Sequence, residues 1–160
     1  MLNNRILNNT LANNIILGKG LGPLRFGMYP KEVQPIIGRG CVFEMPQEDA
    51  DPEALIHHYP HLGIDLTFDV EDEQRLTYID IFDGPYIIMN SLALGMRCAQ
   101  AKEQLRAMGL GKFQEEVLKE WQLLCCHAHS LVLWFQNHRL EKITFGHYWS
   151  KEGNPLWPDT

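Results

Sequence analysis

Two stretches of this chain match one another residue by residue, at separations of 64 to 68 positions. Phe26-Gly27-Met28 corresponds to Leu94-Gly95-Met96, and each triplet stands just before a short segment that ends in glycine. The positions that follow also correspond: Ile64, Leu66, Phe68, Arg75, Leu76, Ile79 and Ile81 in the first half, and Leu131, Leu133, Phe135, Arg139, Leu140, Ile143 and Phe145 in the second. This internal similarity predicts two copies of one supersecondary unit, at about 20–83 and 90–146.

Each copy is predicted to begin with a helix. In the first half, Pro30 suits the first helical turn and Gly38 the C-terminal end, while Pro35 is expected to shorten or distort the helix. In the second half, apolar residues recur at helical spacing through 97–109, and Gly109 ends the helix. The second helix is therefore expected to be the more regular of the two.

Strands are predicted wherever the apolar residues alternate with polar ones. These segments are 41–45, 55–59, 62–70 and 75–82 in the first half, and 121–127, 130–135 and 139–145 in the second. The acidic segment 71–74 and the tripeptide Gln136-Asn137-His138 are expected to be hairpin turns. The acidic segment 47–54 is expected to be a loop, because it is rich in turn-forming residues.

The elements predict an α+β protein with two tandem helix-plus-antiparallel-hairpin repeats. Such a unit cannot bury both of its surfaces alone, so we expect one continuous antiparallel sheet with the helices on one face. Residues 1–160 are expected to form a single domain that ends in a turn-rich tail at 147–160. The face under the helices is expected to carry the core: Ile64, Leu66, Phe68, Ile79, Ile81, Leu131, Leu133, Ile143 and Phe145.

Composition fits a globular protein, with 45% hydrophobic and 21% charged residues among 160. The formal net charge of -6 argues against nucleic-acid binding, which usually requires a basic surface. The asparagine-rich segment 1–20 is expected to be a strand or an arm and shows no export signal. No segment is apolar enough to span a membrane, and the four cysteines are expected to be reduced. These features predict a cytoplasmic protein, with no membrane partner.

Alternation along the strands places a second set of residues on the face opposite the core. This open face is expected to carry Leu76 and Leu140 and, as a partner-binding surface, the following five residues: Asp65, Tyr78, Asp80, Phe82 and Trp134. Aromatic anchors among charges are typical of protein interfaces. The alternative is that this face is only the solvated side of an antiparallel sheet.

The Gly-Pro-Leu-Arg-Phe-Gly-Met turn, the short helix ending in Ile-Ile-Gly and the strand containing Leu-Thr-Tyr-Ile carry a resemblance to known proteins. Together they resemble small tandem-repeat bacterial proteins of the β-lactamase inhibitory protein type and the immunity proteins of polymorphic or contact-dependent toxin systems. The resemblance covers about residues 20–146. It implies a sheet that presents its open face to a partner protein. Unlike the secreted inhibitors of this architecture, the sequence shows no signal peptide and no clear disulfide pair, which favours a cytoplasmic immunity protein that occludes a cognate toxin. The alternative is a non-enzymatic assembly adaptor of similar repeat fold.

Neither catalysis nor metal binding is expected from the cysteine and histidine residues. Cys125, Cys126, His127 and His129, like the group His57, His58 and His61, lack the spacing of a structural zinc site. No orienting group or oxyanion loop accompanies a thiol nucleophile. We therefore expect no catalytic residue, no metal and no cofactor. The acidic runs, at Glu48, Asp49, Asp51 and Glu53 and at Asp69, Glu71, Asp72 and Glu73, either are solvated or attract a basic toxin such as a nuclease.

Overall fold

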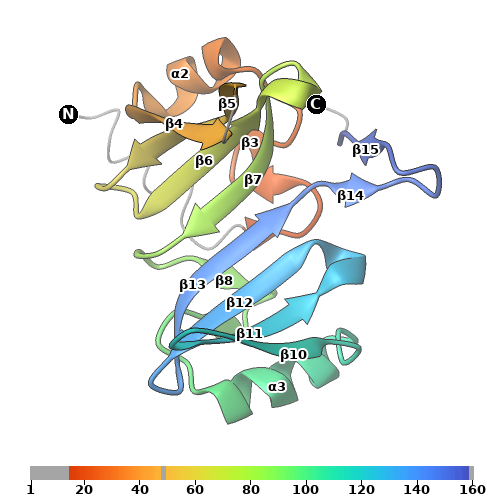
Figure 1. Cartoon of the computed structure of the whole chain (residues 1–160). Helices are drawn as coiled ribbons and strands as arrows, with labels where there is room; N and C mark the ends of the chain where they lie inside the picture. The colour runs from red at the N-terminus through yellow and green to blue at the C-terminus, as the bar shows by residue number, and fades with distance from the viewer. Residues whose placement is uncertain (1–14, 48–49, 159–160) are drawn as a thin grey trace.

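The computed structural model describes the backbone of residues 15–47 and 50–158 and the side chains of residues 15–42 and 54–158. Eight antiparallel strands build a large sheet: β4 Cys41–Gln47, β5 Ala50–Tyr59, β6 Ile64–Asp69, β7 Arg75–Ile81, β10 Gln114–Leu118, β11 Trp121–Cys126, β12 Leu131–Gln136 and β13 Arg139–Gly146. Their spatial order is β10-β11-β12-β13-β7-β6-β5-β4 (Figure 1). The ladder between β13 and β7 joins the two halves of this sheet.

A second, smaller sheet contains five short strands: β1 Ile15–Ile16, β2 Gly20–Leu21, β3 Leu24–Arg25, β8 Ile87–Ile88 and β9 Leu92–Ala93. The α-helices among the described residues are α2 Pro30–Ile37 and α3 Cys98–Ala107, and the 3-10 turns are η1 Val70–Asp72 and η2 His127–His129. A hairpin of β14 Tyr148–Trp149 and β15 Pro155–Leu156 forms the tail.

The predicted α+β fold of two helix-plus-hairpin repeats with helices on one face is wrong. Strands dominate the described residues, and each helix precedes four consecutive strands of the large sheet rather than a hairpin. In Figure 1, α2 and α3 lie at opposite ends of the molecule, with strands of the small sheet between them. The helices are too short to cover the inner face of an eight-stranded sheet, so the small sheet packs against much of that face. The sequence gives little sign of that sheet because its strands are two residues long.

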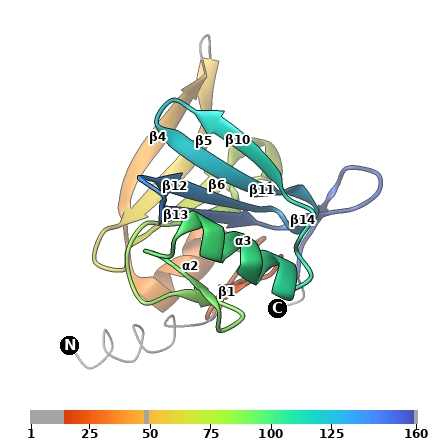
Figure 2. The ribbon, with the colours of Figure 1, turned by 90° about the horizontal axis from the view of Figure 1, so that it is seen from below.

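The nine residues predicted for the core are confirmed, since all of them are at most 1% exposed. They join one buried cluster with side chains of both helices and of the small sheet, such as Val33, Leu105 and Leu24. Seen from below, the helices and β1 lie against the large sheet (Figure 2). Burial between the two sheets and the helices is therefore the main source of stability.

The glycine triplets contact equivalent strands by equivalent hydrogen bonds. The Gly27 amide donates to the Leu76 carbonyl and the Leu76 amide to the Met28 carbonyl, at 2.8 and 2.7 Å. The Gly95 amide donates to the Leu140 carbonyl and the Leu140 amide to the Met96 carbonyl, both at 2.8 Å. Each triplet thus anchors the chain before a helix to the start of a sheet strand, and these contacts explain the matching sequence positions.

Leu76 and Leu140 were expected on the open face, and both are instead buried in the core. The pairing register shifts between Thr67 and Phe68 opposite β7, and between Trp134 and Phe135 opposite β13. A bulge adds one residue to a strand and reverses the face of every residue on its far side. Strict alternation therefore fails at these two leucines.

The structure also tests several local predictions. Residues 1–14 of the expected arm lie outside the described residues, as do 48–49 of the expected acidic loop. Gln47 ends β4 and Ala50 begins β5, so the loop prediction is wrong for 47 and for 50–54. Helix α2 continues through Pro35, and Gly109, with a φ of 79°, follows α3 as predicted. Within the described chain, no helix combines the length and apolar character that crossing a membrane requires.

Candidate functional site

The outer face of the large sheet brings together residues from both halves. Asp65 on β6 lies directly opposite Asp80 on β7, and Asp80 lies opposite Thr144 on β13. Beyond Thr144, the same row continues through Val132 to Cys125. The β13–β7 ladder therefore places the predicted residues of the first half beside those of the second.

A hydrogen-bonded chain crosses the centre of this face. The indole Nε1 of Trp134 donates to the Thr144 hydroxyl at 2.9 Å, and that hydroxyl donates to the Asp80 carboxylate. Lys142 lies over the Trp134 ring with its Nζ 4.0 Å from the ring centroid, and Trp121 packs edge-on against the same ring. Trp134 and Asp80, both predicted for the open face, are thus parts of one network that holds each side chain in a defined orientation.

A second group of contacts extends the network into the first half. His58 Nδ1 hydrogen-bonds to the Asp65 carboxylate, and the His58 ring stacks on Phe82 at a centroid distance of 5.4 Å. Asp65, Phe82, Asp80 and Trp134 therefore lie on one face, as the alternation predicts. His58 was not among the predicted binding residues, although its position opposite Asp65 places it in the same patch.

Two carboxylates stand opposite each other at the centre of the face. Burial raises the pKa of Asp80 most strongly, and the nearby Asp65 raises it further, while the Thr144 hydroxyl and Lys142 oppose the shift. Like charges directly opposite one another on antiparallel strands are destabilising. The isolated protein therefore maintains a carboxylate pair at a cost to its own stability.

Asp80→Asn is expected to stabilise the protein at pH 7 by roughly 0.2 to 1 kcal/mol. Because burial raises the pKa of Asp80 in the folded state, folding favours the protonated form, and wild-type stability from this group rises as pH falls through that pKa. No further gain occurs below the unfolded-state value of about 3.9. The difference between variant and wild type should therefore shrink on acidification, which urea unfolding at pH 7 and pH 4 measures. A difference that grows toward pH 4 contradicts the assignment.

Tyr78 lies at the edge of the face, beside a cavity of about 170 Å³ that is lined also by His127, Ser130 and Thr144. Burial raises the pKa of Tyr78, and Asp69 and Asp72 add to the shift. Behind it, the buried His147 ring packs against Tyr78, Trp149 and Trp157 and holds the tail hairpin against the sheet. The tail therefore supports the predicted binding residue Tyr78 from one side.

The residues of the Cys/His group at 125–129 lie on different sides of the sheet. Cys125 faces the outer row, whereas Cys126 lies in the core, where burial raises its pKa to about 11. His127, which was predicted as the last residue of a strand, instead begins η2. The second histidine group is also split, since His57 packs against Phe68 in the interior and burial lowers its pKa.

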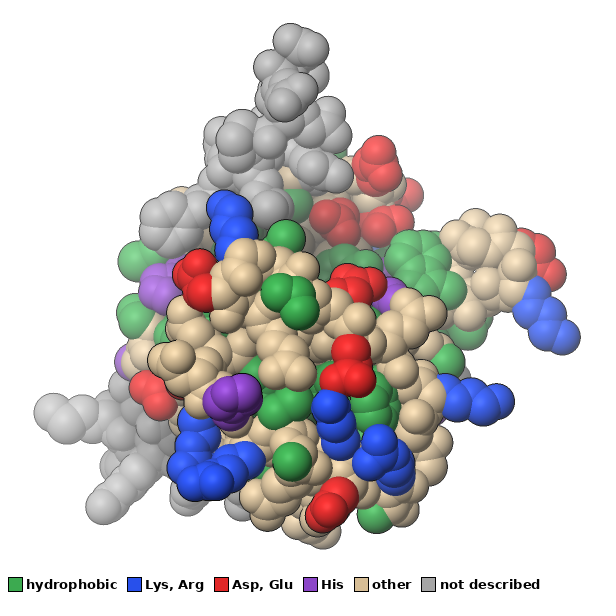
Figure 3. Space-filling model, turned by 60° about the horizontal axis from the view of Figure 1, so that its bottom comes forward, with side chains coloured by type: hydrophobic (Ala, Val, Ile, Leu, Met, Phe, Trp, Pro, Cys, Tyr) green, Lys and Arg blue, Asp and Glu red, His purple; other side chains and the backbone are tan. Residues whose placement is uncertain are grey.

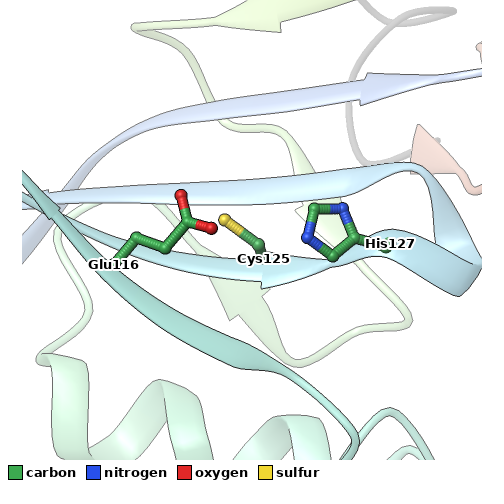
Figure 4. A group of neighbouring side chains, drawn as sticks. All are labelled: Glu116, Cys125 and His127. Carbon is green, nitrogen blue, oxygen red and sulfur yellow. The ribbon is translucent and has the colours of Figure 1, made fainter.

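One part of that cluster gains a neighbouring carboxylate that sequence reasoning missed. Glu116 on β10 reaches Cys125 and His127, and one ligand atom from each of the three lies within 4.8 Å of the others (Figure 4). Every residue of the segment 114–118 is exposed, and the segment was not predicted as a strand. Only the pairing of β10 with β11 brings Glu116 to Cys125, and the exposed Val117 and Leu118 gave little alternation to reveal it.

The acidic run at 69–73 lies around η1, at one end of the molecule. Glu71, Asp72, Glu73 and Arg75 line a shallow hollow together with Trp157 from the tail. The Arg75 guanidinium lies over the Tyr29 ring, 4.8 Å from its centroid. These carboxylates stand on solvent-facing turns, and their arrangement suits long-range attraction of a cation rather than acid–base catalysis.

No protein family, curated protein or solved structure matches this chain. The resemblance to tandem-repeat inhibitor and immunity proteins therefore stays a prediction from the sequence.

Proposed function

We propose that this protein is a cytoplasmic immunity protein that binds a cognate toxin domain through the outer face of the large sheet and occludes it. The observation that carries the proposal is the opposed pair of Asp65 and Asp80 at the centre of that face. A like-charge pair with a raised carboxyl pKa lowers the stability of the free protein. A cationic side chain from a partner would relieve the repulsion, so the pair favours binding a basic surface.

The aromatic residues around the pair supply anchors. Trp134 is held by its indole hydrogen bond and by Lys142, and Phe82 is held by stacking on His58. Side chains that are already ordered lose little entropy on binding, and Trp and Tyr dominate the energetics of many interfaces. A rim of such rings around two carboxylates suits recognition of lysine or arginine side chains in a protein surface.

Charge is distributed unevenly along the chain. Residues 20–83 contain thirteen Asp and Glu but four Lys and Arg, whereas residues 90–146 contain five Asp and Glu and seven Lys and Arg. Figure 3 looks toward the α3 end of the molecule, and Lys and Arg side chains gather in the lower half of that view. A basic toxin would be attracted by the first half and repelled by the α3 end, so the charges would orient its approach.

Co-expression with a candidate toxin domain, chosen from the products of neighbouring genes, tests the proposal. Cells that produce the toxin domain should survive only when this protein is also produced, and the purified proteins should form a complex. Unchanged killing in the presence of soluble, folded protein would contradict the proposed function. Survival without a complex would contradict occlusion as the mechanism.

Substitutions on the face locate the interface. Asp80→Lys and Trp134→Ala are each expected to weaken the complex by about 2 to 4 kcal/mol, or roughly 30-fold to 1,000-fold in Kd. Glu103→Lys makes the same charge change on an exposed position of α3 and should leave Kd within about twofold. Isothermal titration calorimetry measures the three constants, and circular dichroism establishes that each variant is folded. Equal affinities for Asp80→Lys and Glu103→Lys would show that the partner binds elsewhere.

A further inference from the structure

We propose that Glu116, Cys125 and His127 form a binding site for a transition-metal ion such as Zn²⁺. The site lies on the outer face of β10 and β11 and is separate from the carboxylate pair of the proposed toxin interface. Figure 4 shows the Cys125 sulfur between the carboxylate of Glu116 and the imidazole of His127. The three side chains offer one sulfur, one nitrogen and one oxygen ligand.

The pairing register of the sheet produces this grouping. Cys125 pairs with Gln114, and Glu116 pairs with Leu123, so Glu116 and Cys125 are diagonal neighbours on the same face. His127 stands two residues after Cys125, where η2 begins, and extends the same line. The three ligands are contributed by adjacent elements, and β10, β11 and β12 hold those elements by backbone hydrogen bonds.

The donor set selects the class of metal. Thiolate and imidazole ligands favour Zn²⁺, Co²⁺ or related ions over Mg²⁺ and Ca²⁺, which prefer oxygen. In a tetrahedral zinc site, ligand atoms are separated by about 3.5 Å, as follows from metal–ligand distances of about 2.0 to 2.3 Å. The ligand atoms here lie within 4.8 Å of one another. Glu116 and His127 are exposed, so small rotations of these two side chains close the site around an ion.

The Cys125 side chain is buried, and its sulfur lies beside the carboxylate of Glu116. Binding of the ion breaks the S–H bond, forms the metal–sulfur bond and releases the proton to solvent. The positive ion then lies between the thiolate and the carboxylate and neutralises two negative charges.

Three protein ligands leave one tetrahedral position open. His127 also lines the cavity of about 170 Å³ beside Ser130 and Tyr78, so there is room for a water molecule at the edge of the site. Three ligands and an exchangeable water are expected to bind the ion less tightly than a closed structural site with four protein ligands.

Metal titration of the full-length protein tests the site. Cys41 is an exposed thiol outside the group, so Cys41→Ser serves as the reference background. This variant should bind one equivalent of Zn²⁺ after dialysis, measured by elemental analysis. With Co²⁺ it should show a thiolate-to-metal charge-transfer absorption that Zn²⁺ abolishes. Absence of stoichiometric binding, or binding of Co²⁺ without the thiolate band, would overturn the proposal.

Substitutions distinguish this site from adventitious binding. Cys125→Ser, Glu116→Gln and His127→Ala should each weaken Zn²⁺ binding at least about tenfold, because even groups that only support ligands contribute that much. His129→Ala and Glu115→Gln are matched controls outside the group and should leave the affinity unchanged. Glu116 and His127 are exposed, so their substitution should preserve the fold, as thermal unfolding can verify. Affinity that survives Glu116→Gln or His127→Ala would overturn the three-ligand assignment.

Discussion

Phe145→Ala is expected to lower the free energy of unfolding by about 3 to 5 kcal/mol. The Phe145 side chain is fully buried on β13 and packs edge-on against Phe26, which follows β3 of the small sheet, with ring centroids 5.5 Å apart. Its backbone pairs with Ile79 in the ladder that joins the two halves of the large sheet. Truncation therefore leaves a cavity among the apolar side chains where the two sheets meet. Urea unfolding followed by circular dichroism measures the loss.

Val117→Ala is the matched control for this truncation. Val117 lies on the edge strand β10 and is 81% exposed, so its loss should change stability by less than about 0.5 kcal/mol. The contrast tests whether the joint between β13 and β7 is part of the cooperative core. If Phe145→Ala costs less than 1 kcal/mol, the two halves of the sheet do not share one packed interior.

Gly63→Ala is expected to destabilise the protein by about 2 to 5 kcal/mol, the second largest effect. Gly63 has a φ of 70°, in the left-handed region, where a side chain costs about 1 to 2 kcal/mol. An added Cβ would also lie closer than 3.0 Å to the Asp83 carbonyl oxygen, and moving backbone to relieve such crowding costs a further 1 to 3 kcal/mol. The Gly63 carbonyl accepts the Phe82 amide at 2.9 Å, so the displacement would reach the proposed binding face.

Gly95→Ala separates the two causes. Gly95 has a φ of 88°, but apart from the glycine and its two chain neighbours, no heavy atom of the described residues lies within 4 Å of the position that its Cβ would occupy. Only the conformational cost applies, so we expect a loss of about 1 to 2 kcal/mol. Thermal or urea unfolding of both variants compares them directly. Equal losses at the two glycines would show that crowding against Asp83 is relieved without cost.

The candidate site was predicted in part. Asp65, Asp80, Phe82 and Trp134 were placed on one face because alternation along a strand is a local property that holds between bulges. The network that joins them was not predictable, because Thr144 and Asp80 are 64 residues apart and meet only through the β13–β7 ladder. Glu116 was missed for the same reason, since its segment is exposed and acquires a partner only when β10 pairs with β11.

Local pattern in the sequence determined the ends of α3, most strands of the large sheet and the apolar residues that fill its inner face. These depend on residue type and on spacing within a few positions, where backbone preference and burial act directly. The tertiary structure alone decided the fold class, the small sheet that replaces helices as cover, and the inward turn of Leu76 and Leu140. Those features follow from strand register and from packing between distant segments, and one added residue in a ladder reverses the face that a side chain occupies.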